Sequence, residues 1–203
     1  DKAFGALPAA GDRHIVEFFP YFCTEEMQKG QAMGVKLTTI EERRERFTPA
    51  WKKNVRDITT GAKKLEPTVS AEATAKVIAA LAGIAEWKDV INIPNQGQVM
   101  DLPRDVVVET IGLISRDRAV GLPVGTVPPG VLTQIQRHVT NQEMTVEAAL
   151  TGDRGLALQV LLNDPMVGAI RDFRLVEKML DELLLANRKW LPQFFRRRGR
   201  SAR

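Results

Sequence analysis

The chain has 203 residues, 44% of them hydrophobic and 27% charged, which is the composition of an ordinary globular protein with a substantial core. Its one cysteine, Cys23, excludes an internal disulfide and favours a reducing, cytoplasmic compartment, and no apolar run reaches the roughly 18 residues that span a membrane. The net charge is +4, but five arginines lie in the last eight residues, and without them acidic residues outnumber basic ones by one; we therefore expect no nucleic-acid-binding face on the body of the protein.

The first polar cluster follows Gly11 and consists of Asp12, Arg13, His14 and Glu17. Carboxylates accept hydrogen bonds from sugar hydroxyls, an arginine forks onto a carboxylate or phosphate, and an imidazole moves protons near neutral pH. The cluster is therefore a candidate site for a polyhydroxylated or anionic ligand. The alternative is structural, with Asp12 as a helix cap and Arg13 paired with Glu17 one helical turn later.

A densely charged segment from Thr39 to about Arg56 predicts an exposed helix. Thr39 and Glu42 have the spacing of a capping box, and Pro49 must kink or divide the helix. A second helix is predicted to begin after Ser70 as its N-cap. Its apolar face is formed by Val77, Ile78, Leu81 and Ile84.

Two strands are predicted next, one at 90–94 and one beginning at 106 and continuing toward 114. Between them, Asn95 and Gln96 begin a polar turn and form a second candidate site, because amides both donate and accept hydrogen bonds and so suit hydroxyl-rich ligands. Turn chemistry alone would also explain the asparagine, proline and glycine of this segment.

The rest of the chain, from Gly130 to Trp190, is predicted to be helical, with Asp172 capping the last helix. A third candidate site, His138 with the polar residues 141–143, is placed between two helical stretches; a simple polar helix junction is the alternative. The residues from Arg196 to Arg203 read as a solvated basic tail.

These elements predict a mainly helical α+β protein with a small sheet. No strand is followed by a G-x-G-x-x-G turn, so we expect no NAD site in this chain. Two histidines and one cysteine without paired spacing predict no metal site in this chain either. No catalytic residue can be assigned from the pattern.

Several motifs, in the same order along the chain, resemble the C-terminal part of the family 4 glycoside hydrolases. The motifs are Gly11-Asp12-Arg13-His14-Ile15-Val16-Glu17-Phe18, Asn92-Ile93-Pro94-Asn95-Gln96-Gly97-Gln98-Val99, Leu102-Pro103, Val108-Glu109, Asn141-Gln142-Glu143, Val146-Glu147-Ala148-Ala149-Leu150-Thr151-Gly152-Asp153, Asn163-Asp164-Pro165 and Trp190-Leu191-Pro192. The Gly-Asp-Arg-His form is similar to the branch that acts on galacturonides and galactosides.

The resemblance implies a fold like the C-terminal domain of lactate and malate dehydrogenases, covering residues 1–195. It implies a glycosidase that uses NAD and Mn²⁺ in the full-length enzyme, oxidising the sugar at C3 and cleaving the glycosidic bond by elimination. It also implies that Asp12, Arg13, His14, Glu17, Asn95 and Gln96 contact the substrate.

We therefore expect this chain to be the substrate-facing and oligomer-forming part of a glycosidase whose NAD-binding half is a separate N-terminal portion. On this expectation the isolated chain is inactive and the partners are a carbohydrate, an α-linked uronic acid or hexose, and further copies of the chain. The alternative is a sugar-binding or oligomerisation module without catalysis.

Overall fold

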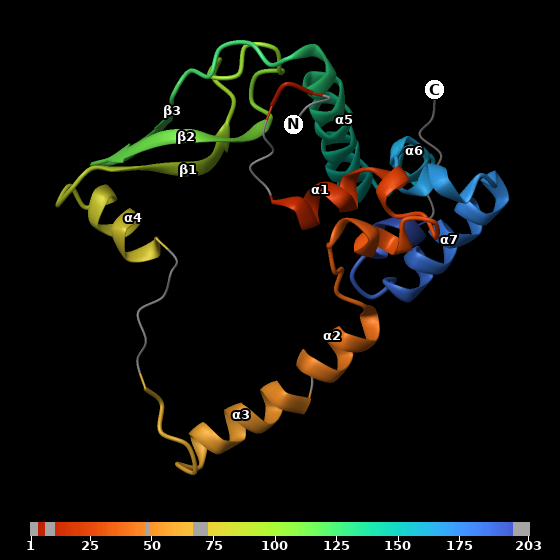
Figure 1. Cartoon of the computed structure of the whole chain (residues 1–203), viewed down its shortest axis with the longest axis horizontal. Helices are drawn as coiled ribbons and strands as arrows, with labels where there is room; N and C mark the ends of the chain where they lie inside the picture. The colour runs from red at the N-terminus through yellow and green to blue at the C-terminus, as the bar shows by residue number, and fades with distance from the viewer. Residues whose placement is uncertain (1–3, 7–10, 48, 67–72, 197–203) are drawn as a thin grey trace.

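The computed structural model of the protein describes residues 4–6, 11–47, 49–66 and 73–196. Within these ranges the chain is mainly helical and has one three-stranded antiparallel sheet, which confirms the predicted α+β class (Figure 1). The first half contains α1 (Asp12–Phe18), η1 (Pro20–Phe22), η2 (Gln28–Met33), α2 (Ile40–Phe47), α3 (Pro49–Thr59) and α4 (Thr74–Leu81). The second half contains β1 (Trp87–Pro94), β2 (Val107–Ser115), β3 (Arg118–Gly121), α5 (Pro129–Thr151), α6 (Arg154–Asn163), η3 (Val167–Ile170), α7 (Phe173–Ala186) and η4 (Pro192–Phe195).

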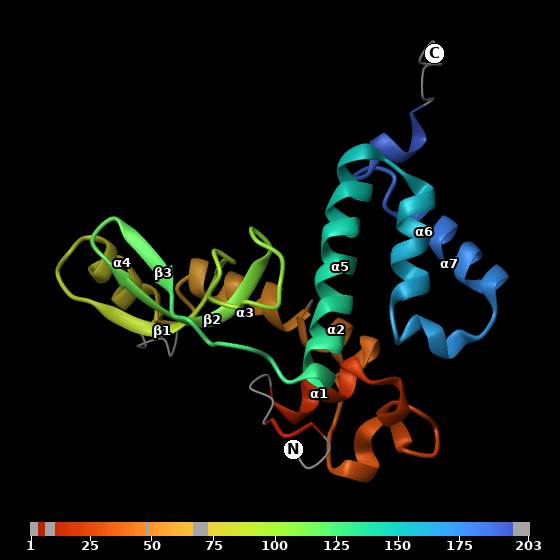
Figure 2. The same ribbon diagram turned by 90° about the horizontal axis from the view of Figure 1, so that it is seen from above.

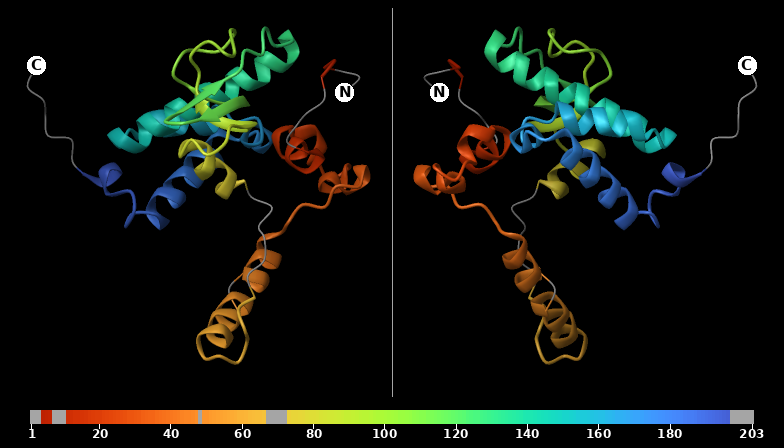
Figure 3. Two further views of the ribbon diagram at one scale, coloured as in Figure 1. Left: turned by 90° about the vertical axis from the view of Figure 1, so that its left-hand side faces the viewer. Right: turned by 90° about the vertical axis from the view of Figure 1, so that its right-hand side faces the viewer.

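Helices α2 and α3 form an arm that projects from the rest of the molecule (Figure 3). The predicted cap is present, because the Thr39 hydroxyl accepts a hydrogen bond from the Glu42 amide at 3.1 Å. The predicted division is also present: α2 ends at Phe47 and α3 begins at Pro49. The arm leads toward α4, which begins at Thr74 with Ala73 as its N-cap residue; Ser70, the predicted N-cap, lies outside the described residues.

The sheet has the order β1-β2-β3, and β1 pairs with β2 from Trp87↔Ile114 to Pro94↔Val107. Both predicted strands are confirmed, although β1 begins a little earlier than its apolar run suggested. Strand β3 was not predicted, since it has only four residues and follows a tight turn in which Asp117 takes a positive φ of 60°.

A small core joins the sheet to the longest helix. The buried residues Val99, Leu102, Val106 and Val108 pack together, and Val127, Leu132 and Val139 pack against them. This cluster holds the loop after β1 against α5 and so fixes the position of the second candidate site relative to the helices.

Helices α5, α6 and α7 lie side by side, with α6 in the middle (Figure 2). Asp172 caps α7 as predicted, accepting hydrogen bonds from the amides of Arg174 and Leu175. The buried side of α7 is the stripe of Val176, Leu180 and Leu184. No helix among the described residues is long and apolar enough to cross a membrane.

The turn from α5 to α6 depends on Gly152, which ends α5 with φ 70° in the left-handed region. The C-terminal η4 packs directly over this turn, and a Cβ at Gly152 would collide with the backbone carbonyl of Gln193. The Gln193 side chain also donates a hydrogen bond to the Ala149 carbonyl. Of the predicted basic tail, only Arg196 is within the described residues.

Candidate functional site

Helix α1 carries the first candidate cluster and begins immediately after Gly11. Gly11 takes φ 78°, and no side chain makes an N-cap hydrogen bond at this helix. The alternative in which Asp12 caps the helix is therefore wrong, because Asp12 is the first helical residue rather than the residue before it. The side chain of Asp12 lies outside what the structure describes, and its role in substrate binding stays a prediction.

The helix brings Arg13, His14 and Glu17 together, as their spacing predicted. Arg13 Nε lies 4.0 Å from Glu17 Oε1, and His14 Nδ1 lies 3.2 Å from Glu17 Oε2. The side chains are partly exposed, at 41%, 61% and 42% respectively. The pairing of Arg13 with Glu17 that the structural alternative predicted is thus present, and so is the exposed polar surface that a ligand site needs.

Arg13 has a further partner that sequence reasoning missed. Its Nη2 donates a hydrogen bond of 2.7 Å to the hydroxyl of Thr38, which lies 25 residues later. Its Nε is buried and makes no hydrogen bond. Nothing in the local pattern signals this contact, because it depends on how the chain between the two residues folds back.

That fold-back packs residues 20–38 against α1. Val16 is buried in the contact, and the Cys23 thiol donates a hydrogen bond of 3.3 Å to the Val16 carbonyl. Burial raises the pKa of the Cys23 thiol, and the nearby carboxylate of Glu17 raises it further. Tyr21 packs edge-on against Phe22, and burial raises the pKa of its phenol. Cys23 is thus a packing residue.

The other side of α1 faces α5, where the Phe18 and His138 rings meet edge to face with centroids 4.8 Å apart. The third candidate site, His138 with residues 141–143, was predicted to lie between two helical stretches, and this is wrong because α5 is continuous from Pro129 to Thr151. Asn141 is buried and its Oδ1 accepts a 2.6 Å hydrogen bond from Asn163, which ties α5 to α6.

The second candidate site is the loop after β1, and Asn95 is its centre. The Asn95 side chain is 0% exposed. Its amide nitrogen lies 2.9 Å from the carbonyl oxygens of Val99, Leu102 and Pro103, and its oxygen accepts from the amides of Gly97 and Val99. This side chain therefore organises the loop, and its predicted contact with a sugar would have to be indirect.

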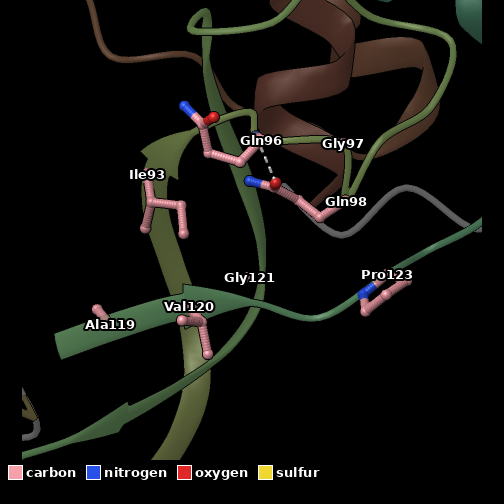
Figure 4. Close-up of a pocket in the computed structure, with 8 residues that line it drawn as sticks. All are labelled: Ile93, Gln96, Gly97, Gln98, Ala119, Val120, Gly121 and Pro123. Carbon is pink, nitrogen blue, oxygen red and sulfur yellow. Dashed lines mark hydrogen bonds between the residues drawn. The ribbon is translucent and has the colours of Figure 1, made fainter.

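Gln96, in the same loop, is exposed. Its Nε2 donates to Asp105 at 2.6 Å, and its Oε1 accepts from Arg104 Nη2 at 2.8 Å. Its backbone amide donates at 2.7 Å to the buried side chain of Gln98 (Figure 4). Neither Arg104 nor Asp105 was singled out from the sequence.

A pocket of about 350 Å³ lies between this loop and strand β3 (Figure 4). It is lined by Ile93, Gln96, Gly97, Gln98, Ala119, Val120, Gly121 and Pro123. Gly121 allows Gln98 to lie close to the strand, because a Cβ there would be 2.9 Å from Gln98 Cγ. The pocket offers amide groups, which can bind hydroxyls, and contains no charged side chain in its lining.

The two clusters occupy different places in the fold. The described polar contacts of Arg13, His14 and Glu17 are with one another and with Thr38, whereas those of Asn95 and Gln96 are within their own loop. In the described part of the chain, no three side chains of histidine, cysteine, aspartate or glutamate gather to hold a metal ion.

Comparison with known proteins identifies what this arrangement resembles. The profile of the family 4 glycosyl hydrolase C-terminal domain matches residues 1–167. The α-galacturonidase of Bacillus subtilis (strain 168) is 39% identical over 166 residues, which cover 82% of this chain and 36% of that protein. The chain thus spans well under half the length of this relative.

Solved structures agree on the fold. The crystal structure of the Bacillus subtilis protein LplD, assigned as a glucosidase, superposes with a TM-score of 0.78 at 36% identity, covering 90% of this chain and 41% of that one. A 6-phospho-beta-glucosidase from Thermotoga maritima, solved with manganese, NAD⁺ and glucose-6-phosphate, has a TM-score of 0.59 at 24% identity over 85% of this chain and 40% of that one. The second likeness establishes the fold alone.

Proposed function

The chain belongs to the family 4 glycosyl hydrolases, as their C-terminal domain, and from this premise we propose that it forms the substrate-facing part of a glycosidase that cleaves an α-linked uronic acid. The family match favours this function over a stand-alone sugar-binding module. The observation that carries the proposal is the partly exposed side chain of Arg13, held on α1 beside His14 and Glu17.

A uronic acid differs from a neutral hexose by its carboxylate. Arginine offers a planar fork of N–H donors that matches a carboxylate, and such charge-assisted pairs are among the stronger hydrogen bonds in proteins. In this proposal Asp12, His14, Glu17 and Gln96 face the sugar hydroxyls, whereas Asn95 acts indirectly, through the loop that it organises. The galacturonidase name of the Bacillus subtilis relative supports this substrate class.

We assign NAD and Mn²⁺, which the resemblance implies, to the complete enzyme. Bound there, they would supply redox and Lewis-acid chemistry at C2 and C3 of the sugar. The proposal, which follows the resemblance, is that both are held by a part of the enzyme that this chain does not cover. A homo-oligomer in the cytoplasm is part of the same proposal, because one cysteine fits a reducing compartment.

The test is replacement of Arg13 in the complete enzyme by alanine and by lysine. Losing a charge-assisted pair costs about 1.5–3 kcal/mol, so kcat/KM for a galacturonide should fall about tenfold to a hundredfold. The neutral galactoside should be much less affected. Arg13→Lys should remain impaired, because an ammonium lacks the fork.

Arg44→Ala, at an exposed arginine on the arm, is the matched control and should leave both substrates unchanged. Equal losses on the galacturonide and the galactoside after Arg13→Ala would contradict the proposal. Arg13 would then act as the helix partner of Glu17 rather than as the residue that binds the carboxylate.

A further inference from the structure

We propose that Thr38 is a positioning residue for substrate selection, holding the Arg13 guanidinium so that its terminal nitrogens meet the substrate carboxylate end-on. The inference rests on the proposed function and deepens it. Thr38 lies outside every motif that resembles the family, and only the fold places it beside Arg13, with Oγ1 accepting from Nη2 at 2.7 Å.

The state of each nitrogen of Arg13 determines how a ligand can approach. Nε is buried and without a hydrogen bond, since Glu17 Oε1 is 4.0 Å away. A side-on fork, which uses Nε and one terminal nitrogen, is therefore blocked. The side chain keeps 41% of its surface exposed, and in this proposal the ligand meets it at the terminal nitrogens. One hydrogen of Nη2 is taken by Thr38, so the remaining donors are the second hydrogen of Nη2 and both hydrogens of Nη1.

Thr38 is itself fixed from both sides. On its C-terminal side, Thr39 caps α2 through the amides of Glu42 and Arg43. On its N-terminal side, the Val35 amide donates to the Gly30 carbonyl at 3.1 Å. Gly30 is in turn pressed against α1, because a Cβ there would be 3.0 Å from Val16 Cγ1.

These contacts fix the position of Thr38, and its hydroxyl therefore holds the Arg13 side chain in one orientation rather than leaving it free at the surface. Arginine has a long, mobile side chain, and a guanidinium oriented before binding loses less freedom when the carboxylate arrives. Removing the hydroxyl should therefore reduce selection of the charged substrate while leaving the sugar contacts of the neutral one.

The experiment uses the complete enzyme with Thr38→Val, which keeps the shape and removes the hydroxyl, and Thr38→Ser, which restores it. Thr60→Val on the arm is the control. For Thr38→Val we expect kcat/KM on the galacturonide to fall about tenfold, as expected for a hydrogen bond to a charged group. The galactoside should change less than about twofold. Thr38→Ser should recover most of the loss.

A cycle with Arg13 separates the two proposals. If Thr38 acts through Arg13, then Thr38→Val should have no further effect on selectivity in the Arg13→Ala enzyme. If Thr38→Val impairs both substrates equally while Arg13→Ala impairs mainly the galacturonide, Thr38 is merely structural and this inference fails alone. If Arg13→Ala impairs the galacturonide and the galactoside equally, the proposed function fails. If circular dichroism shows that the Thr38→Val enzyme does not fold, Thr38→Ala replaces it. The measured quantity is the same, the ratio of kcat/KM for the galacturonide to kcat/KM for the galactoside.

Discussion

At the scale of single residues, Asn95 shows that an amide in a ligand-like motif can be used entirely by its own loop. Its oxygen and nitrogen contact five backbone groups across residues 97–103. Buried polar groups need hydrogen-bond partners, and here the backbone groups of the loop have the Asn95 side chain as their partner. Replacing this side chain should therefore cost stability.

We expect Asn95→Ala to lower the free energy of unfolding by about 2–4 kcal/mol, because it leaves buried backbone groups without partners. Gln96→Ala, whose side chain is exposed in the same loop, should change it by no more than about 0.5 kcal/mol. Urea denaturation of the two variants measures both effects. Similar small losses for the two would mean that water replaces the Asn95 contacts.

How far the candidate site could be predicted depends on the distance along the chain. The contact of Glu17 with Arg13 and His14 follows from helical spacing, so the sequence was sufficient. The contact of Thr38 with Arg13 could not be predicted from the sequence, because a contact across 25 residues depends on packing around Val16. For Asn95 the motif indicated an amide of importance, but whether it faces a ligand or its own backbone depends on how the loop closes.

At the scale of elements, the same limit separates what was predicted from what was missed. Apolar runs in the sequence predicted β1 and β2, and Asp172 predicted the start of α7, because these signals depend only on neighbouring residues. Strand β3 has no such apolar run, and its strand conformation depends on its pairing with β2 rather than on its own sequence. Polar residues in the middle of α5 suggested a break, whereas Asn141 is a buried contact to α6.

Helices α6 and α7 are joined by an ion pair whose pH dependence can be measured. Arg154 Nε donates to Asp181 Oδ1 at 2.7 Å, and this hydrogen bond lowers the pKa of the Asp181 carboxyl below its ordinary value. A lowered pKa in the folded state means that the contribution to stability is present above the ordinary aspartate pKa and is lost as the pH falls through the lowered one.

Titration of Asp181 by carboxyl ¹³C NMR should therefore give a pKa below that of a free aspartate, and Arg154→Gln should return it toward the ordinary value. Arg174→Gln, at an exposed arginine near the start of α7, is the control and should leave the titration unchanged. An unshifted Asp181 in the unmodified protein would show that solvent and salt screen the pair.

At the scale of the whole molecule, α7 presents apolar side chains on more than its buried stripe. Phe173, Leu175, Leu183 and Leu185 are between 48% and 64% exposed. Exposed large apolar side chains promote association between protein surfaces. The proposal of a homo-oligomer therefore has specific residues to test.

We expect the chain to form a dimer or larger species in light scattering, and Leu183→Lys with Leu185→Lys to shift it toward the monomer. Leu65→Lys, at an exposed leucine outside α7, should not. A monomer at all concentrations across a tenfold dilution of the unmodified chain would contradict the prediction.

The turn at Gly152 has a consequence in genetic terms. Every missense change that a single base substitution makes in a glycine codon introduces a Cβ, and at this position that atom would meet the backbone carbonyl of Gln193. A side chain in the way could rotate aside, but a carbonyl moves only with its whole segment. A missense change at this codon therefore requires that the backbone of η4 shift at the same time.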